Sequence, residues 1–431
     1  MEKRQIMEIL TDWNFWGNYV DESILRENYL KILNELIKSK EIIVAKGVRR
    51  SGKSTLLYQF LKKKIENGLE GKNTLIVNFE DPRFPLLKAE DLVKIYETYL
   101  EELQPGKEQY VVLDEVQVVR GWEKFARYLK ESKKVNVFVT GSSSKVLSEE
   151  FATLLAGRHV DMEILPLSFK EFLKFKKFEI ESGIDLIKYR HRIKAFFKEY
   201  MEFGGFPKVT LVEKPERKKL LESYFDDIII KDVTKRFNIR ESDKLEELAK
   251  FYLTNISSLQ SFNKLKNVLK LSLDSIERFS NYLSIARFLF FTSKFSFSMK
   301  EQILAVKKIY CIDVGLRNAI SFRFSEDFGR LAENIVFLEL FRRGNNIFYW
   351  RDYQQKEVDF IVNGKKLKNL IQVCWDIENE KVRNRETSSL IRAMKGFKFR
   401  NGLIITEDFE GEEKIGNKKI IYKPLWKWLL T

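Results

Sequence analysis

The stretch that decides the fold of this chain lies at residues 42–55 and reads IIVAKGVRRSGKST. Its first four residues form a short apolar run, which is typical of a buried parallel strand. A glycine-containing turn follows at once, and after it LLYQFLKKKI has the apolar spacing of a helix. A turn of this kind between a strand and a helix gathers backbone N–H groups around one point. The stretch therefore predicts an anion-binding turn in an α/β fold.

Residues 47–55 fit the phosphate-loop pattern Gly-x4-Gly-Lys-Ser/Thr in full, and they lie between a strand and a helix as the pattern requires. We expect Lys53 to reach the β and γ phosphates of ATP and Ser54 to hold Mg²⁺. The helix that follows adds partial positive charge at its first turn. The residues expected to bind the nucleotide are Gly47, Val48, Arg49, Arg50, Ser51, Gly52, Lys53, Ser54 and Thr55.

Two acids follow another apolar run, YVVL at residues 110–113. In folds with a phosphate loop, an acid at this place faces the metal, so Asp114 is expected to orient Mg²⁺. Glu115 is then expected to polarise the water that attacks the γ phosphate. An acid next to the metal acid predicts hydrolysis and an extra strand between the loop strand and the Asp114 strand. The candidate strand is residues 135–140, and Thr140 or Ser142 at its end would sense the γ phosphate.

Arg158 precedes the last apolar run of this region, residues 162–165. Two roles are open for it. It could act on the nucleotide of a neighbouring subunit as a catalytic arginine finger, which implies a homo-oligomer, or it could be an ion-paired surface residue. Two roles are also open for the aromatic cluster Trp13–Trp16, which could border the adenine or pack in a core.

Composition narrows the class of protein. The 431 residues include 77 Lys and Arg against 62 Asp and Glu, a net charge of +15, which suits a polyanion such as DNA or serves solubility alone. Two Cys and two His are too few for a Cys/His zinc site, and they indicate a reducing compartment. No apolar run approaches the roughly 20 residues of a membrane-spanning helix. We expect a cytoplasmic protein with no zinc and no membrane contact.

Several motifs together resemble the AAA+-like ATPases of archaea and bacteria, whose core is fused to a carboxy-terminal region of unknown function. The resemblance covers nearly the whole chain. Besides GVRRSGKST, it rests on DWNFW at 12–16, LDEVQ at 113–117, TGSSS at 140–144, LPLSFKEF at 165–172, FGGFP at 203–207, KKIYCIDVGLRN at 307–318 and EVDF at 357–360.

This resemblance and the strand pattern imply four parts. A three-layer P-loop ATPase core of the AAA+ type with an amino-terminal helical extension is expected over residues 1–165, and a helical lid over 166–253. A winged helix is expected over 254–325. A restriction-endonuclease-like α/β domain is expected over 326–431.

The expected winged helix contains more basic than acidic residues. Residues 256–308 contain nine Lys or Arg and three Asp or Glu, which suits contact with DNA phosphates. Its second helix would be the recognition helix. The alternative is a winged helix that contacts protein or only packs.

The restriction-endonuclease-like fold implies a helix Glu, a strand Asp and then Asp/Glu-x-Lys on the next strand, which bind Mg²⁺. Glu333 and Glu339 lie on the expected helix, and Asp359 fits the strand position. The third element has Gln372 where a carboxylate is expected and Cys374 where Lys is expected. We therefore expect no nuclease activity from this domain.

Taken together, the sequence predicts an ATP-binding and hydrolysing ATPase that couples its nucleotide state to engagement of DNA. The alternatives are a nucleotide-dependent regulator of a protein partner and an ATP-controlled nuclease.

Overall fold

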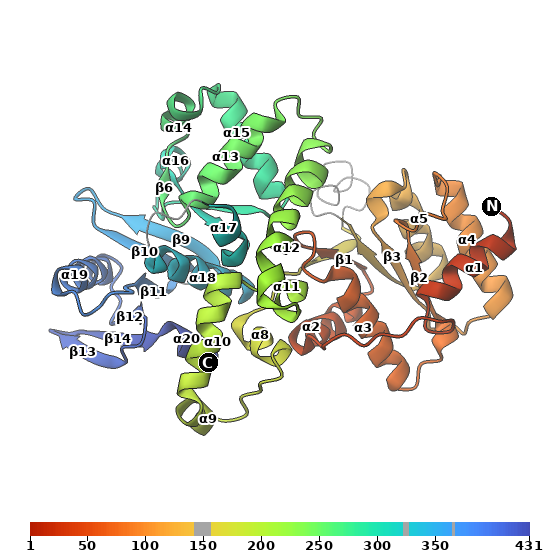
Figure 1. Ribbon diagram of the computed structural model, residues 1–431, viewed down its shortest axis with the longest axis horizontal. Helices are drawn as coiled ribbons and strands as arrows, with labels where there is room; N and C mark the ends of the chain where they lie inside the picture. The colour runs from red at the N-terminus through yellow and green to blue at the C-terminus, as the bar shows by residue number, and fades with distance from the viewer. Residues whose placement is uncertain (142–156, 322–326, 364–366) are drawn as a thin grey trace. The chain divides into compact units, whose positions relative to one another are not determined.

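The computed structural model of the chain describes residues 1–141, 157–321, 327–363 and 367–431. The chain divides into two compact units, Met1–Ile164 and Leu165–Thr431 (Figure 1). Within the described residues, no helix is both long and apolar enough to cross a membrane.

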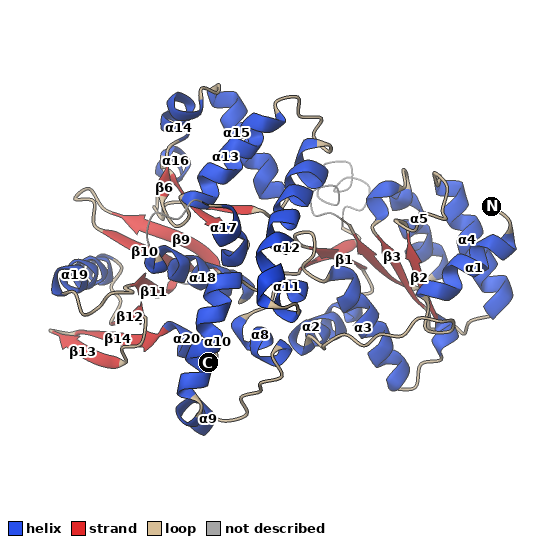
Figure 2. Ribbon diagram, in the orientation of Figure 1, coloured by secondary structure: helices blue, strands red, loops and turns tan. Residues whose placement is uncertain are grey.

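The first unit is built on a parallel sheet of five strands in the order β2-β3-β4-β1-β5 (Figure 2). The strands are β1 (Ile42–Lys46), β2 (Thr74–Asn78), β3 (Tyr110–Asp114), β4 (Asn136–Thr140) and β5 (His159–Glu163). β4 lies between β1 and β3, which confirms the predicted extra strand. Ala45 pairs with Thr140, and Leu113 pairs with Val139. The carboxyl ends of β1, β3 and β4 therefore meet at one edge of the sheet.

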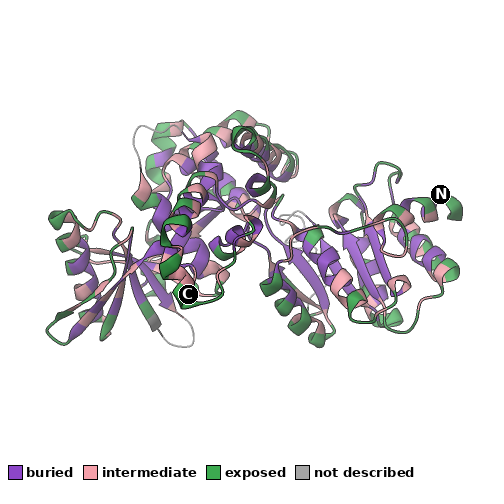
Figure 3. Ribbon diagram, turned by 60° about the horizontal axis from the view of Figure 1, so that its bottom comes forward, coloured by how far each residue is buried: buried purple, intermediate pink, exposed green. Residues whose placement is uncertain are grey.

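Helices cover both faces of this sheet. One face packs against α1 (Lys3–Trp13), α4 (Ala89–Leu103) and α5 (Trp122–Tyr128), and the other against α2 (Glu27–Leu36) and α3 (Lys53–Glu66). The side chains of β1 alternate between the two cores, with Ile42 and Val44 in one and Ile43 and Ala45 in the other. The strands are buried over most of their length, as a parallel sheet between two helical layers requires (Figure 3).

The amino-terminal aromatic segment lies along the edge strand β2. The buried side chain of Asn14 accepts a hydrogen bond from Ile76 N at 2.6 Å and donates one to Ile76 O at 2.9 Å. Trp16 Nε1 donates to Thr74 O at 3.0 Å. This segment therefore satisfies backbone groups that an edge strand leaves free, and its role in the structure is packing.

The second unit begins with helices. These are α8 (Phe169–Phe175), α9 (Gly183–Lys188), α10 (Arg190–Phe203), α11 (Pro207–Leu211), α12 (Lys214–Asp227) and α13 (Ser242–Thr254), with a π-helical segment at Ile228–Thr234. The Ser168 hydroxyl accepts from Glu171 N at 3.2 Å, and Glu171 Oε2 accepts from Ser168 N, so α8 begins with a capping box.

A three-stranded antiparallel sheet follows, in the order β6-β8-β7. Its strands are β6 (Leu259–Gln260), β7 (Leu289–Thr292) and β8 (Lys307–Cys311). Helices α14 (Phe262–Leu269) and α15 (Leu273–Ile285) lie between β6 and β7 in the chain, and α16 (Met299–Leu304) lies between β7 and β8. Two helices and then the strand pair β7–β8 follow β6 along the chain, and the assignment of this region as a winged helix stays a prediction.

The last part of the unit is a mixed sheet of six strands in the order β13-β14-β12-β11-β10-β9. The strands are β9 (Asn346–Arg351), β10 (Glu357–Asn363), β11 (Leu367–Val373), β12 (Asn401–Thr406), β13 (Gly411–Ile415) and β14 (Lys418–Pro424). The helices are α17 (Val314–Ile320), α18 (Phe328–Arg342), α19 (Glu380–Gly396) and α20 (Leu425–Trp428). The sequence pattern predicts β9 to β12 and misses the β13–β14 hairpin.

Two of the motifs that carry the resemblance, at residues 203–207 and 307–318, pack directly on each other. The buried carboxylate of Asp313 accepts hydrogen bonds from Gly205 N at 2.7 Å and Leu316 N at 2.9 Å. Burial raises the pKa of Asp313 to about 6, although these backbone N–H groups act in the opposite direction. Gly204 has a φ of +73°, and a Cβ there would lie 2.0 Å from Asp313 Oδ1. The glycines let the two segments approach this closely.

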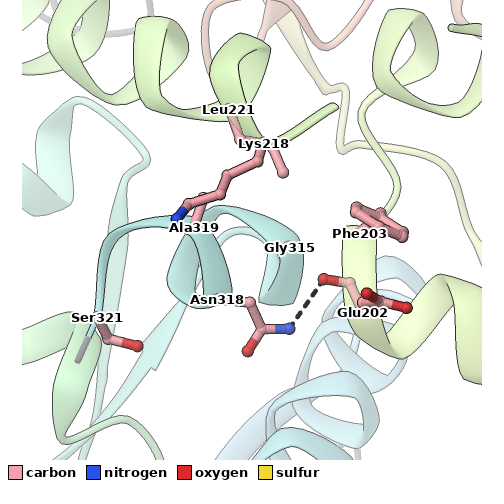
Figure 4. Close-up of a pocket in the computed structure, with 8 residues that line it drawn as sticks. All are labelled: Glu202, Phe203, Lys218, Leu221, Gly315, Asn318, Ala319 and Ser321. Carbon is pink, nitrogen blue, oxygen red and sulfur yellow. Dashed lines mark hydrogen bonds between the residues drawn. The ribbon is translucent and has the colours of Figure 1, made fainter. Parts of the chain in front are cut away.

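A shallow pocket of about 400 Å³ lies beside this contact, between α10, α12 and α17. Phe203, Leu221 and Ala319 line its apolar part, and Asn318 donates from Nδ2 to the Glu202 carbonyl at 2.9 Å (Figure 4). Asn318 thereby bonds a carbonyl in the last turn of α10. The pocket follows from the packing of the two motifs.

We predict that Gly315→Ala destabilises the protein. A Cβ at this position would lie 2.0 Å from Phe203 O, whereas alanine in an unhindered helix is favourable. The free energy of unfolding should fall by about 1–3 kcal/mol, as for other overpacked sites. Urea unfolding measures it. Gly329→Ala is the matched control, because no heavy atom lies within 4 Å of a Cβ on that helical glycine. Equal stability of the two variants would contradict the prediction.

Candidate functional site

The loop of residues 47–55 begins at the end of β1 and ends in the first turn of α3. Gly47 has a φ of +155°, and a Cβ there would lie 2.2 Å from Ile164 O, so no other residue fits without a shift of the backbone. Gly52 has a φ of +92°, and Arg50 also has a positive φ, of 69°. Two glycines and one left-handed arginine therefore fold the loop over the amino end of α3, where backbone N–H groups have no helical partner.

The polar groups of this loop fit a phosphate ligand. Ser51 is fully buried, and its Oγ has no hydrogen-bond partner among the residues that the structure describes. Lys53 is 6% exposed, and its ammonium donates long hydrogen bonds of 3.3 Å to Gly47 O and Val48 O. Val48 is buried, Arg49 is half-buried, and Arg50 and Thr55 are exposed. An orphaned hydroxyl and a buried ammonium with weak partners are the donors that an anion in the loop would use.

Asp114 ends β3 next to this loop. Its Oδ1 accepts from Ser54 Oγ at 2.7 Å and from Thr140 Oγ1, and its Oδ2 accepts from Tyr58 OH at 2.8 Å. Asp114 is 3% exposed. Burial and the neighbouring Glu115 charge raise its pKa, and the three hydroxyl groups oppose this shift. The structure thus brings Ser54 and Asp114, the two residues predicted to hold the metal, into direct contact.

Glu115 follows Asp114 in a left-handed conformation, with a φ of 56°, which turns the chain away from the strand. Its backbone N–H donates to Thr140 Oγ1 at 3.0 Å, and Gln117 Nε2 donates to its carboxylate. The Thr140 hydroxyl therefore bonds both predicted acids. The roles of Thr140 or Ser142 in sensing the γ phosphate stay predictions, and Ser142 lies outside the described residues.

Arg158 lies near the amino end of β1, whereas the phosphate loop follows the carboxyl end of this strand. Its carbonyl accepts from Ile42 N at 3.0 Å, at the amino end of β1, and its guanidinium pairs with Glu131 at 2.7 Å. A five-residue strand at about 3.3 Å per residue places it about 16 Å from the loop of its own subunit. Of the two open roles, the ion pair is present, and action on a neighbouring subunit stays a prediction.

Two residues of the site escape sequence reasoning. Arg26 is 3% exposed, and its Nη1 donates to Ser51 O at 3.0 Å, so it supports the loop from outside. Tyr58 lies one turn beyond Ser54 on α3, and its hydroxyl reaches Asp114. The spacing of four residues from Ser54 to Tyr58 puts both on one helix face, which is the signal that identifies Tyr58.

The residues of the expected nuclease pattern separate into two groups. Glu333, Asp359 and Gln372 line a cavity of about 560 Å³ in the second unit. Glu339 instead pairs with Arg342 and Arg343. Cys374 is buried in the apolar core of the six-stranded sheet. Burial raises the pKa of Glu333 to about 8, and the charge of Asp359 adds to this shift.

Comparison with known protein families finds three matches along the chain. Residues 39–173 match an AAA domain, and residues 194–327 and 328–427 match two domains of unknown function. A relative from Methanocaldococcus jannaschii is 37% identical over 445 residues, covering 96% of this chain and 97% of its own. One from Haemophilus influenzae is 31% identical over 411 residues, covering 94% and 98%. Both are named only as uncharacterized proteins.

Similar solved structures include the Walker-type ATPase PABY2304 of Pyrococcus abyssi, with a TM-score of 0.46 and 14% identity over 69% of this chain and 96% of that chain. The Aeropyrum pernix ORC1 protein in complex with DNA has a TM-score of 0.31 and 14% identity, covering 70% and 93%.

We predict that Tyr58→Phe lowers the affinity of the site for Mg²⁺. The change removes one of the three hydroxyl groups that orient Asp114, and loss of such a supporting bond lowers metal affinity about 10–100-fold. The Mg²⁺ concentration for half-maximal nucleotide hydrolysis should rise accordingly. Tyr99→Phe is the control, because its buried hydroxyl donates to Lys72 O at 2.6 Å, away from the site. An unchanged Mg²⁺ dependence in Tyr58→Phe would refute the role.

Proposed function

Since the chain belongs to a family of archaeal and bacterial proteins that join an AAA domain to carboxy-terminal domains of unknown function, we propose that it is a Mg²⁺-dependent ATPase. The observation that carries this proposal is the hydrogen bond of 2.7 Å between Ser54 Oγ and Asp114 Oδ1. It joins the expected metal ligand of the phosphate loop to the acid at the carboxyl end of β3. Both groups are oxygen donors, which Mg²⁺ prefers.

Each residue of the site has a separate task in this proposal. Bound Mg-ATP supplies the phosphoryl group and the ion that neutralises its charge. The loop N–H groups and Lys53 bind phosphate oxygens, and Ser54 and Asp114 hold the metal. Glu115 orients the attacking water and accepts its proton at the carboxylate. Thr140 fixes the positions of both acids through the two bonds of its hydroxyl.

Three substitutions test these tasks. Lys53→Ala should abolish ATP binding, because it removes the buried ammonium.

Glu115→Gln should retain ATP binding and lose hydrolysis by about 10²–10⁴-fold, since an amide cannot accept the proton. Arg158→Ala should retain binding and lose hydrolysis if the residue acts on a neighbouring subunit. Calorimetry measures binding, and phosphate release measures the rate. If Glu115→Gln lost ATP binding as well as hydrolysis, the role of Glu115 in activating water would be contradicted.

We also propose that the nucleotide state controls engagement of DNA through the winged helix expected over residues 254–325, which contains α14 to α16 and β6 to β8. The net charge of +15 and three exposed lysines on and just after α14 (Lys264, Lys266 and Lys270) support this proposal. The exposed face of α15, the expected recognition helix, is less suited, because it presents Asp274 and Glu277 and pairs Asp274 with Arg278 at 3.4 Å. Contact with DNA phosphates is therefore assigned to α14.

A protein partner is the second candidate, and a specific surface favours it. Around α16 the apolar side chains of Phe297, Met299 and Leu304 are 87%, 69% and 73% exposed. Ile303 is 67% exposed on the same short segment. Exposed apolar residues so close together are typical of a protein contact and unusual for a surface that meets only DNA phosphates.

A salt titration separates the two candidates. Duplex DNA binding through α14 should weaken steeply with salt, and replacing Lys264, Lys266 and Lys270 with alanine should lower the slope of log K against log salt by about 3, or about 1 per phosphate contact. The matched control removes the same charge from Lys395, Lys398 and Arg400, which are exposed elsewhere in the unit. Equal slopes for both triple variants would refute DNA contact through α14 and favour the protein partner.

A further inference from the structure

Lys308, on β8, extends from the three-stranded sheet into the cavity beside the six-stranded sheet. It is 2% exposed, and its Nζ lies 2.8 Å from an oxygen of each of three carboxylates. These belong to Glu333 on α18 and to Glu357 and Asp359 on β10. An ammonium has three N–H donors and no acceptor, so three carboxylate oxygens use its full capacity.

The acids around Lys308 have further partners that fix them in place. Tyr310 OH donates to Glu333 Oε1 at 2.7 Å, and Val373 N donates to Asp359 Oδ2 at 2.9 Å. Both bonds come from elements that flank the cavity, β8 and β11. The oxygens that approach Lys308 are therefore held by the surrounding structure and not by the ammonium alone.

Gln372 belongs to the same network, in which its amide both accepts and donates a hydrogen bond. Its Oε1 accepts from Asp359 N at 3.1 Å, and its Nε2 donates to Glu386 Oε2 at 2.7 Å. Arg385 donates to the other oxygen of Glu386 at 2.8 Å from Nε. A carboxylate at position 372 would have no hydrogen to give to Glu386 and would repel it. The amide is thus the group that this arrangement requires.

These residues do not fit the Mg²⁺ that the restriction-endonuclease-like fold implies. Mg²⁺ demands octahedral oxygen ligands at about 2.0–2.1 Å, but the available carboxylate oxygens surround an ammonium. Within the described part of the chain, no group of three or more His, Cys, Asp or Glu is arranged to hold a metal ion. Gln372 and Cys374 replace the expected carboxylate and lysine, and Cys374 packs in the apolar core.

We infer that Lys308 is a built-in cation that takes the place of a divalent metal in this centre, and that the centre is an ionic joint between β8, β10 and α18. Two other contacts join the same parts of the unit. Phe295 N donates to Tyr349 O at 2.6 Å, between the segment after β7 and β9, and Asn334 Nδ2 donates to Cys311 O at 3.0 Å. Lys308 adds the buried charge that these neutral contacts lack.

The joint has a clear energetic consequence. Removing one partner of a buried ion pair leaves the others charged and without compensation, which is strongly destabilising. Without Lys308, the carboxyl groups of Glu333, Glu357 and Asp359 face one another across a space that a cation filled. Loss of the lysine should therefore create, at this centre, an affinity for divalent cations that the unaltered centre does not have.

The test compares Lys308→Met with Lys307→Met in the full-length protein without nucleotide. Lys307 is the matched control, because its ammonium donates to Ser293 Oγ at 3.0 Å and Gln302 O at 3.2 Å, which are neutral groups. Lys308→Met should have the lower unfolding temperature, and Mn²⁺ should raise that temperature in this variant alone. Equal unfolding temperatures for the two variants, or no response of Lys308→Met to Mn²⁺, would overturn the proposal.

A second measurement uses the unaltered protein, so it decides the question even if Lys308→Met does not fold. In the absence of nucleotide, water-proton relaxation with Mn²⁺ should detect no site that depends on Asp359. Duplex and branched DNA should stay intact with Mg²⁺ or Mn²⁺. A Mn²⁺ site that Asp359→Asn abolishes, or cleavage lost in that variant, would show that the centre binds metal. Neither result bears on ATP hydrolysis, because no nucleotide is present.

Discussion

The nucleotide site depends on one contact, the hydrogen bond of Ser54 to Asp114, and this contact depends on where β4 lies. With β4 inserted between β1 and β3, the carboxyl ends of β1 and β3 are separated by one strand. Thr140, at the end of β4, donates its hydroxyl hydrogen to the Asp114 carboxylate and accepts from the backbone N–H of Glu115. The first turn of α3 then brings Ser54 and Tyr58 to the same carboxylate. The order of strands therefore determines the chemistry of the site.

The two units contain buried carboxylates with opposite electrostatic surroundings. Asp114 accepts hydrogen bonds from three neutral hydroxyl groups, which stabilise its negative charge but do not neutralise it. A bound cation is therefore needed to neutralise this charge. Asp359 pairs with the ammonium of Lys308 and accepts a hydrogen bond from a backbone N–H, so its charge is neutralised within the chain. The first arrangement suits a site that responds to a ligand, and the second suits a fixed structural joint.

The sequence predicts what local patterns encode. The phosphate loop, strands β1 to β4 and strands β9 to β12 follow from apolar runs and glycine spacing. The apolar pattern predicts the fifth strand of the parallel sheet at residues 162–165, but β5 is His159–Glu163, which is not an apolar run. Lys308 could not be predicted, because its three partners are brought to it by tertiary folding from α18 and β10, and by composition it counts as a DNA-binding charge. The β13–β14 hairpin escapes because GEEKI, at 411–415, is a charged and largely exposed strand with no apolar run.

The bonds of Asn14 to both backbone groups of Ile76 also bear on how copies of this protein can meet. An outer strand with free N–H and C=O groups is a template on which another chain can add a strand and start a growing stack. Here the template is already occupied by the chain's own amino-terminal segment at this point. Assembly of subunits by continuous sheet growth is therefore blocked at the β2 edge.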